Sequence, residues 1–103
     1  MSNTLAELTE KVSRVSDTYA KRIGIERDAD WYVLKLQEEL GELTAEYLRT
    51  TGRGRKGSEH AADSEMQLAD EAADLLAHLL LFIAAKGIDV ESALDRKWFK
   101  YLR

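Results

Sequence analysis

The chain has 103 residues, of which 45% are hydrophobic, and a formal net charge of -4 at pH 7. This length corresponds to one domain with a modest core, so we assign residues 1–103 to a single domain. The absence of cysteine excludes disulfides and thiolate metal sites, and two histidines are too few for the usual zinc site. The acidic balance argues against binding to polymeric nucleic acid.

The sequence contains no segment typical of export or membrane insertion. Residues 1–7 form neither a basic leader nor an apolar stretch of export length, and Asp74 and His78 interrupt the longest apolar run. We therefore expect a soluble, cytoplasmic protein that has no membrane partner.

Apolar residues recur at intervals of three and four along the chain. Because proline is also absent, this spacing predicts four helices and no sheet. The first helix is predicted to begin near Leu5 and to end near Gly24. It carries an apolar seam that is expected to pack against another helix, made of Leu5, Leu8, Val12, Val15, Tyr19 and Ile23.

The second helix is predicted to begin after Asp28 or Asp30, either of which can cap its first turn. One stripe of this helix is apolar and another is charged. The charged stripe consists of Lys35, Glu39, Glu42 and Glu46. Residues 50–58 follow and are rich in glycine and charge, which predicts a mobile loop.

The third helix is predicted to begin between Ser58 and Ser64 and to end at Lys86, because Gly87 can adopt the left-handed conformation that ends helices. It is apolar on nearly every side and is expected to be central. Asp89 then caps a short fourth helix. The predicted inner face of the fourth helix consists of Val90, Ala93, Leu94 and Trp98.

Two pairs of acidic residues stand out on the second and third helices. Glu39 and Glu42 are three residues apart, as are Glu71 and Asp74, so each pair lies on one helix face. Asp74 lies inside the apolar run 72–85, where an unpaired carboxylate is costly. If the two helices pack together, four carboxylates converge, and such an oxygen-rich set suits Mg²⁺ or Mn²⁺.

A simpler interpretation of these acids remains open at this point. Charged helix faces are common, and the glutamates can be ordinary solvated residues. Asp74 then requires a separate explanation, such as a salt bridge to Lys35 or Lys97.

Residues 38–43, EELGEL, and residues 71–76, EAADLL, resemble the EExxE and ExxD signature of the MazG-like all-α nucleoside triphosphate pyrophosphohydrolases. The resemblance extends from about Trp31 to Arg103. It implies an all-α, four-helix, MazG-like bundle that is completed by oligomerisation, as a homodimer or a dimer of dimers. Residues 71–80 also resemble the related phosphoribosyl-ATP pyrophosphohydrolases of histidine biosynthesis.

The resemblance implies an enzyme that cleaves a nucleotide between its α and β phosphates and releases a nucleoside monophosphate and pyrophosphate. A noncanonical or deoxynucleoside triphosphate removed for nucleotide pool sanitation is the expected substrate. Glu38 matches the acid that orients or deprotonates the attacking water, so it is the expected general base. The positions that match the Mg²⁺ ligands are Glu39, Glu42, Glu71 and Asp74.

The expected substrate-binding residues are Lys97, Lys100, His78 and Trp31. Lys97 matches a late lysine of the family and, with Lys100, can bring positive charge to a polyphosphate. The alternative is that both lysines simply favour the negative end of their helix. His78 lies where relatives contact the base or sugar, and Trp31 can stack on a base, although both residues also suit a core.

Other functions remain open from the sequence. The enzyme can instead act on phosphoribosyl-ATP, or the chain can be a catalytically silent module that binds a nucleotide or a partner protein. The base and sugar preference, the number of metal ions, the assembly and the physiological role are not fixed by the residues. The same holds for whether the basic loop at residues 53–56 closes on phosphates.

Overall fold

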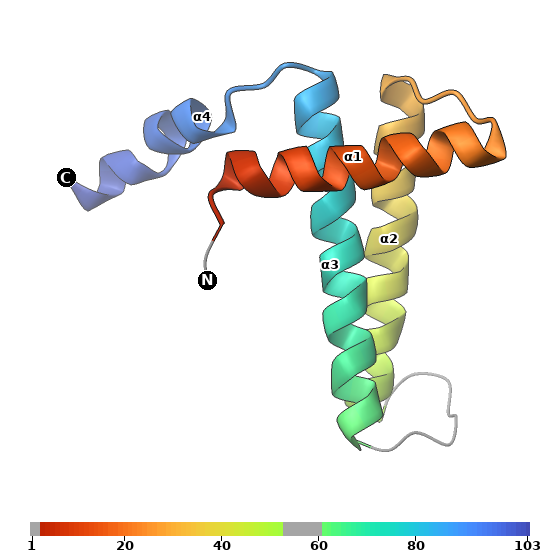
Figure 1. The fold of residues 1–103 in the computed structure, drawn as a ribbon. Coiled ribbons are helices and arrows are strands. Elements are labelled where there is room, and N and C mark those ends of the chain that lie inside the picture. Colours follow the sequence, from red (N-terminus) through yellow and green to blue (C-terminus); the bar gives the residue numbers. More distant parts are fainter. Residues whose placement is uncertain (1–2, 53–60) are drawn as a thin grey trace.

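In the computed structural model of the protein, residues 3–52 and 61–103 are described, with side chains from residue 64 onwards in the second stretch. These residues form helices and no strand, which confirms the predicted all-α class. No helix among them has the length and apolar character of a membrane span. The elements are α1 (Leu5–Ile23), α2 (Ala29–Thr50), α3 (Ala61–Ala85), α4 (Val90–Lys97) and the short 3₁₀ helix η1 (Phe99–Leu102) (Figure 1).

The helix ends lie where short polar side chains and glycines predict them. The carboxylate of Asp28 accepts a hydrogen bond from the backbone N–H three residues ahead at 2.8 Å, and Asp89 does the same at 3.1 Å. Asp28, rather than Asp30, is therefore the cap of α2. Gly24 and Gly87 have φ values of 70° and 62°, so each supplies the left-handed residue that ends its helix.

Helices α2 and α3 run antiparallel and form a long hairpin, and α1 crosses one face of it near the end where α2 begins (Figure 1). The buried apolar side chains come from all three helices: Ala20 from α1, Tyr32 from α2, and Leu80 and Leu81 from α3. α3 contacts both other helices, as expected of the central helix. The core therefore lies where α1 crosses the hairpin.

Arg27, in the link between α1 and α2, fixes the position of the crossing helix. Its guanidinium donates to Asp17 at 2.7 Å and also to the hydroxyl of Ser16, both on α1. The same group lies 5.9 Å from the centre of the Tyr32 ring on α2. Because Arg27 is largely shielded from solvent, these contacts tie α1 to the start of α2 more firmly than a surface ion pair does.

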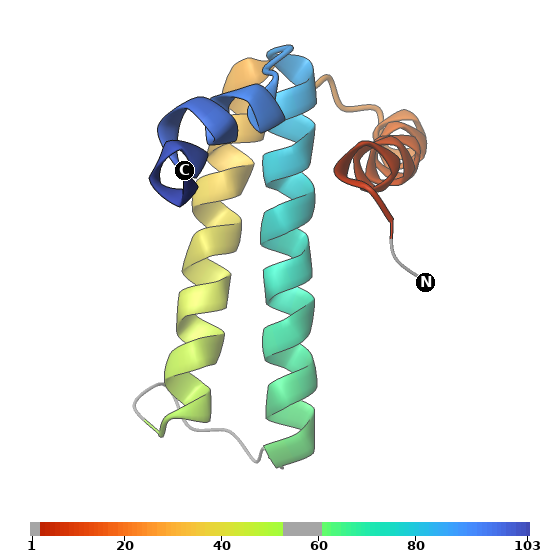
Figure 2. The ribbon, with the colours of Figure 1, turned by 90° about the vertical axis from the view of Figure 1, so that its left-hand side faces the viewer.

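α4 and η1 together form an arm, residues 90–102, that extends away from the hairpin (Figures 1 and 2). Leu94 and Trp98 were predicted on an inner face, but both are exposed, because the link after Gly87 directs the arm away from the rest of the chain. Leu102 at its end is 83% exposed. The radius of gyration is 16.3 Å, whereas a compact chain of this length has about 13 Å, so the single chain is open.

Half of the apolar seam predicted for α1 is also exposed. Val15, Tyr19 and Ile23 lie largely in solvent, while Leu5, Leu8 and Val12 are half-buried. α1 crosses the hairpin at a steep angle, so the hairpin covers only part of the α1 seam (Figure 1).

Truncating Leu80 tests the position of the core. Leu80 is 3% exposed, so Leu80→Ala is expected to lower the free energy of unfolding by about 2 to 4 kcal/mol, because it leaves a cavity. Met66 is 67% exposed on the same helix, so Met66→Ala serves as the control and is expected to cost under about 1 kcal/mol. Urea denaturation at one protein concentration measures both losses, and equal losses would contradict this core.

Candidate metal centre

The five motif acids come together along the hairpin. α2 supplies Glu38, Glu39 and Glu42, and α3 supplies Glu71 and Asp74. Among the described residues, two groups have carboxylate oxygens within 4.8 Å of one another. These groups are Glu38 with Glu39 and Glu42, and Glu39 with Glu71 and Asp74. Glu39 belongs to both groups and is the centre of the arrangement.

The buried acid of this centre is Glu39 rather than Asp74. Glu39 is 7% exposed, whereas Asp74 is exposed, although its position in an apolar run predicted burial. The difference has a geometric cause, because α3 buries Leu80 and Leu81 and turns Asp74 toward an open cleft. The expectation from the sequence that Asp74 is the buried acid was therefore wrong.

The surroundings of Glu39 and Glu71 disfavour their charged forms. Burial raises the pKa of Glu39, and the carboxylates of Glu42 and Asp74 raise it further, while His78 and Lys35 partly offset the shift. The pKa of Glu71 is raised by burial first and then by the same neighbouring acids, and a hydrogen bond with Glu42 also favours its protonated form. Without a cation, Glu39 and Glu71 are therefore harder to deprotonate than ordinary glutamates.

The donor set fits Mg²⁺ or Mn²⁺. All five side chains offer carboxylate oxygens, which hard divalent cations prefer. An octahedral Mg²⁺ with bonds of about 2.1 Å holds its ligand oxygens about 3 to 4 Å apart, so the observed groups need to contract only slightly. A cation here also relieves the repulsion that raises the pKa of Glu39.

Lys35 pairs with the first motif rather than with Asp74. Its Nζ lies 2.7 Å from Glu38 Oε1 and 3.9 Å from Glu39 Oε2. The hydrogen bond from Lys35 lowers the pKa of Glu38, which is exposed and stays ionised at the edge of the centre. Among the described residues neither Lys35 nor Lys97 forms the salt bridge to Asp74 that the sequence suggested.

A cleft of about 690 Å³ opens beside these acids, between α1 and the hairpin, and its size is in the range of small-molecule sites. Glu39 and Asp74 lie in its wall with Trp31 and His78, whose ring centres are 6.2 Å apart. His78 Nδ1 lies 2.9 Å from the backbone oxygen of Asp74. Because that oxygen only accepts, Nδ1 carries a proton, and in the neutral imidazole Nε2 is then an acceptor.

No family model, curated protein or solved structure matches this chain. The interpretation of the site therefore depends on its own geometry and on the residues of the two motifs.

The expected substrate-binding residues divide into two sets. Trp31 and His78 line the cleft beside the acids. Lys97, on α4, and Lys100, on η1, do not line it, because the arm extends away from the hairpin. The basic loop at residues 53–56 lies outside the described residues.

Sequence reasoning missed the contribution of α1 to the cleft. Five α1 residues line it: Lys11, Val12, Val15, Ser16 and Tyr19. Val12, Val15 and Tyr19 were interpreted as packing residues because they follow a helical apolar seam. Lys11 and Ser16 directly beside that seam are the available signal, since a purely structural seam does not require polar groups there.

Replacing Glu39 tests whether its charge is costly in the absence of metal. Glu39→Gln is expected to stabilise the metal-free protein by roughly 1 kcal/mol at pH 7.5, because it removes a buried charge repelled by its neighbours. The raised folded-state pKa makes this cost fall as the pH is lowered, so at pH 4.5, the usual pKa of the group, the gain is expected to be much smaller. Thermal unfolding with and without Mg²⁺ measures both effects.

The same experiment tests metal binding directly. Mg²⁺ is expected to raise the unfolding temperature of the wild type and of the control Glu65→Gln, an exposed acid on α3 outside both groups. It is expected to have little effect on Glu39→Gln. Equal stabilisation of all three proteins by Mg²⁺ would show that the cation binds elsewhere.

Proposed function

We propose that this protein is a Mg²⁺-dependent nucleotide pyrophosphohydrolase that cleaves between the α and β phosphates of a nucleoside triphosphate. The observation that carries the proposal is the convergence of two carboxylate groups that share the buried Glu39, beside a cleft of nucleotide size. The resemblance of residues 38–43 and 71–76 to the MazG-like signature supports the same reaction. A noncanonical or deoxynucleotide removed from the pool is the expected physiological substrate.

The acids at the centre hold Mg²⁺ in this proposal, through Glu39, Glu42, Glu71 and Asp74. When bound, the cation polarises the phosphoryl oxygens and neutralises charge that develops during hydrolysis. The position of Glu39 in both groups allows it to contribute to either or both cation sites. Its burial keeps water from competing for that carboxylate.

Glu38 acts on the attacking water in the proposed mechanism. The hydrogen bond from Lys35 keeps this carboxylate ionised and fixes its direction. It accepts a hydrogen bond from the water and takes its proton as the oxygen attacks the α-phosphorus. The bond to the oxygen that bridges the α and β phosphorus atoms breaks, and pyrophosphate leaves. A carboxylate with a lowered pKa is a weak base, so orientation of the water is the larger part of its role.

The nucleoside occupies the apolar part of the cleft. Trp31 offers an aromatic face there, and His78 Nε2 offers a hydrogen-bond acceptor. Base stacking on an aromatic face tolerates every base, so selectivity depends on polar groups such as His78.

The active form in this proposal is an oligomer of identical chains, a dimer or a dimer of dimers. The arm exposes Trp98, Tyr101 and Leu102, and its basic residues complement the acidic centre in charge. A second copy that covers the arm buries this apolar surface and brings Lys97 and Lys100 near the acids of its partner. The open shape of the single chain supports this arrangement.

Pyrophosphate release is the direct test of the reaction. We expect Mg²⁺-dependent release from at least one member of a panel of common and modified nucleoside triphosphates and phosphoribosyl-ATP. Asp74→Asn and Glu39→Gln are each expected to lower the rate at least about 100-fold, because each removes a proposed metal ligand. Glu65→Gln is the matched control and is expected to keep the wild-type rate.

The panel separates the candidate functions. Release confined to phosphoribosyl-ATP would assign the protein to that reaction instead. No release by the wild type from any substrate, with nucleotide binding retained, would leave a silent binding module. Full activity of Asp74→Asn would remove the acidic centre from the mechanism.

The mass in solution tests self-association. Wild type is expected at two or four times the chain mass of 11.7 kDa. Trp98→Ala is expected to weaken association about 30-fold, since buried interface tryptophans contribute about 2 kcal/mol or more. Lys86→Ala, an exposed residue ahead of the arm, is the control in sedimentation equilibrium. A wild-type monomer at micromolar concentration would contradict this assembly.

A further inference from the structure

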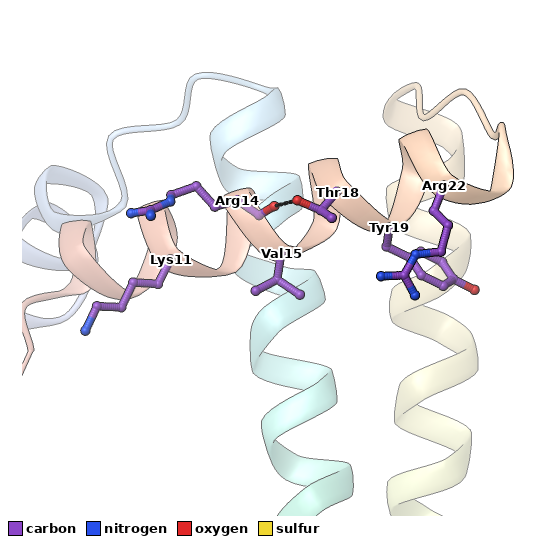
Figure 3. Close-up of a pocket in the computed structure, with 6 residues that line it drawn as sticks. All are labelled: Lys11, Arg14, Val15, Thr18, Tyr19 and Arg22. Atoms are coloured by element: carbon purple, nitrogen blue, oxygen red, sulfur yellow. Dashed lines mark hydrogen bonds between the residues drawn. The ribbon is translucent and has the colours of Figure 1, made fainter.

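One stripe of α1 overhangs the face of the hairpin that carries the cleft. Lys11, Val15 and Tyr19 are spaced four residues apart and point to the same side of the helix (Figure 3). In Figure 3 Tyr19 lies over α2, whereas the side chain of Lys11 extends from the other end of the stripe, away from α3. All three residues line the cleft that also contains Glu39 and Asp74. α1 is therefore a roof over the cleft, with a cationic end and an aromatic end.

Two lysines, Lys35 and Lys11, line the cleft, and they have different kinds of partner. Lys35 forms ion pairs with Glu38 at 2.7 Å and with Glu39 at 3.9 Å. Lys11 Nζ donates to the amide oxygen of Asn3 at 3.2 Å, a neutral and exposed partner. In the part of the chain that the structure describes, Lys11 forms no ion pair. Its charge is therefore available to an anion in the cleft.

A polyphosphate in this cleft requires a cation away from the metal-binding acids. The carboxylates and the phosphates repel one another, and bound metal offsets this repulsion only where the two meet. Of the residues that line the cleft, Lys11 is the cation on the roof. A charge-assisted hydrogen bond to phosphate is stronger than the bond to a neutral amide, so Lys11 can exchange one partner for the other. Its flexible stem allows the movement.

We propose that Lys11 binds the β and γ phosphates of the nucleotide and thereby makes the site select triphosphates over monophosphates. This inference rests on the proposed function and adds a substrate-binding residue from α1. Lys11 supplies this contact within one chain, whereas Lys97 and Lys100 are on the arm. Arg27 stabilises the roof through Ser16 and Asp17, which keeps Lys11 over the cleft.

Equilibrium binding separates this role from catalysis. The probes are a nucleoside triphosphate whose α–β bridging oxygen is replaced by a methylene group, which is not cleaved, and the corresponding monophosphate, both with Mg²⁺. Lys11→Ala is expected to weaken binding of the triphosphate analogue about 10-fold, the effect of losing one charge-assisted hydrogen bond. Binding of the monophosphate is expected to weaken less than about twofold. In the hydrolysis assay KM is expected to rise by the factor seen for the triphosphate analogue, with kcat nearly unchanged.

Lys21→Ala is the matched control, because Lys21 is an exposed lysine of the same helix that does not line the cleft. It changes the net charge equally and is expected to leave both affinities unchanged. Lys11→Arg keeps the charge and is expected to retain most of the triphosphate affinity. Thermal unfolding of each variant verifies its fold, and Lys11→Gln replaces Lys11→Ala if the alanine variant unfolds.

The outcomes distinguish this inference from the proposed function. The role of Lys11 would be overturned if Lys11→Ala and Lys21→Ala lost equal affinity for the triphosphate analogue, if Lys11→Ala lost equal affinity for both ligands, or if it lost none. Hydrolysis by the wild type would still stand in each case. A wild type that neither binds the analogue nor releases pyrophosphate would overturn both.

Discussion

The carboxylate of Glu39 is buried between two helices while other carboxylates lie close to it. Burial and repulsion both raise the pKa of this group, and the nearest cation, Lys35, is 3.9 Å away and bonded more closely to Glu38. A buried carboxylate in such surroundings lowers the stability of the fold, because an apolar residue of the same size has no cost of charge desolvation and repulsion. Such costs are typical of functional sites, where a bound cation or substrate offsets them.

The crossing of α1 creates both the core and the cleft. Near the end of the hairpin, Ala20, Tyr32 and the two core leucines of α3 exclude water, and Arg27 holds the crossing helix in place. Beside this core the cleft opens between α1 and the hairpin, next to the acids. The packing of α1 on the hairpin therefore determines how wide the cleft is and which α1 side chains face it. A change at Arg27 acts on the cleft without contacting a ligand.

The open shape of the chain connects the site to the proposed assembly. The arm carries aromatic residues into solvent, and two exposed residues of the α1 seam, Val15 and Tyr19, line the cleft. Covering these surfaces with a second copy stabilises the fold and narrows the route to the acids at the same time. In this proposal stability and substrate access are coupled through the same exposed side chains. The single chain already contains the five acids and the cleft beside them.

The sequence was sufficient for the local features of this protein. Helical periodicity, the caps at Asp28 and Asp89, and the glycines at 24 and 87 depend on neighbours a few residues away, so they can be derived without a fold. The three-residue spacing of the acids likewise places each pair on one helix face. The expectation that all five acids, Glu38 included, belong to one centre came instead from the resemblance of the two motifs.

The tertiary structure decided which of these residues share an environment. It buried Glu39 and exposed Asp74, because the rotation of each helix about its axis is set by packing against its partner. It also brought Lys11 and Ser16 into the cleft and directed the arm, with Lys97 and Lys100, away from it. These outcomes depend on the crossing angle of α1 and on the direction of the link after Gly87. The crossing angle is fixed by contacts between residues far apart in the sequence, which periodicity and spacing do not encode.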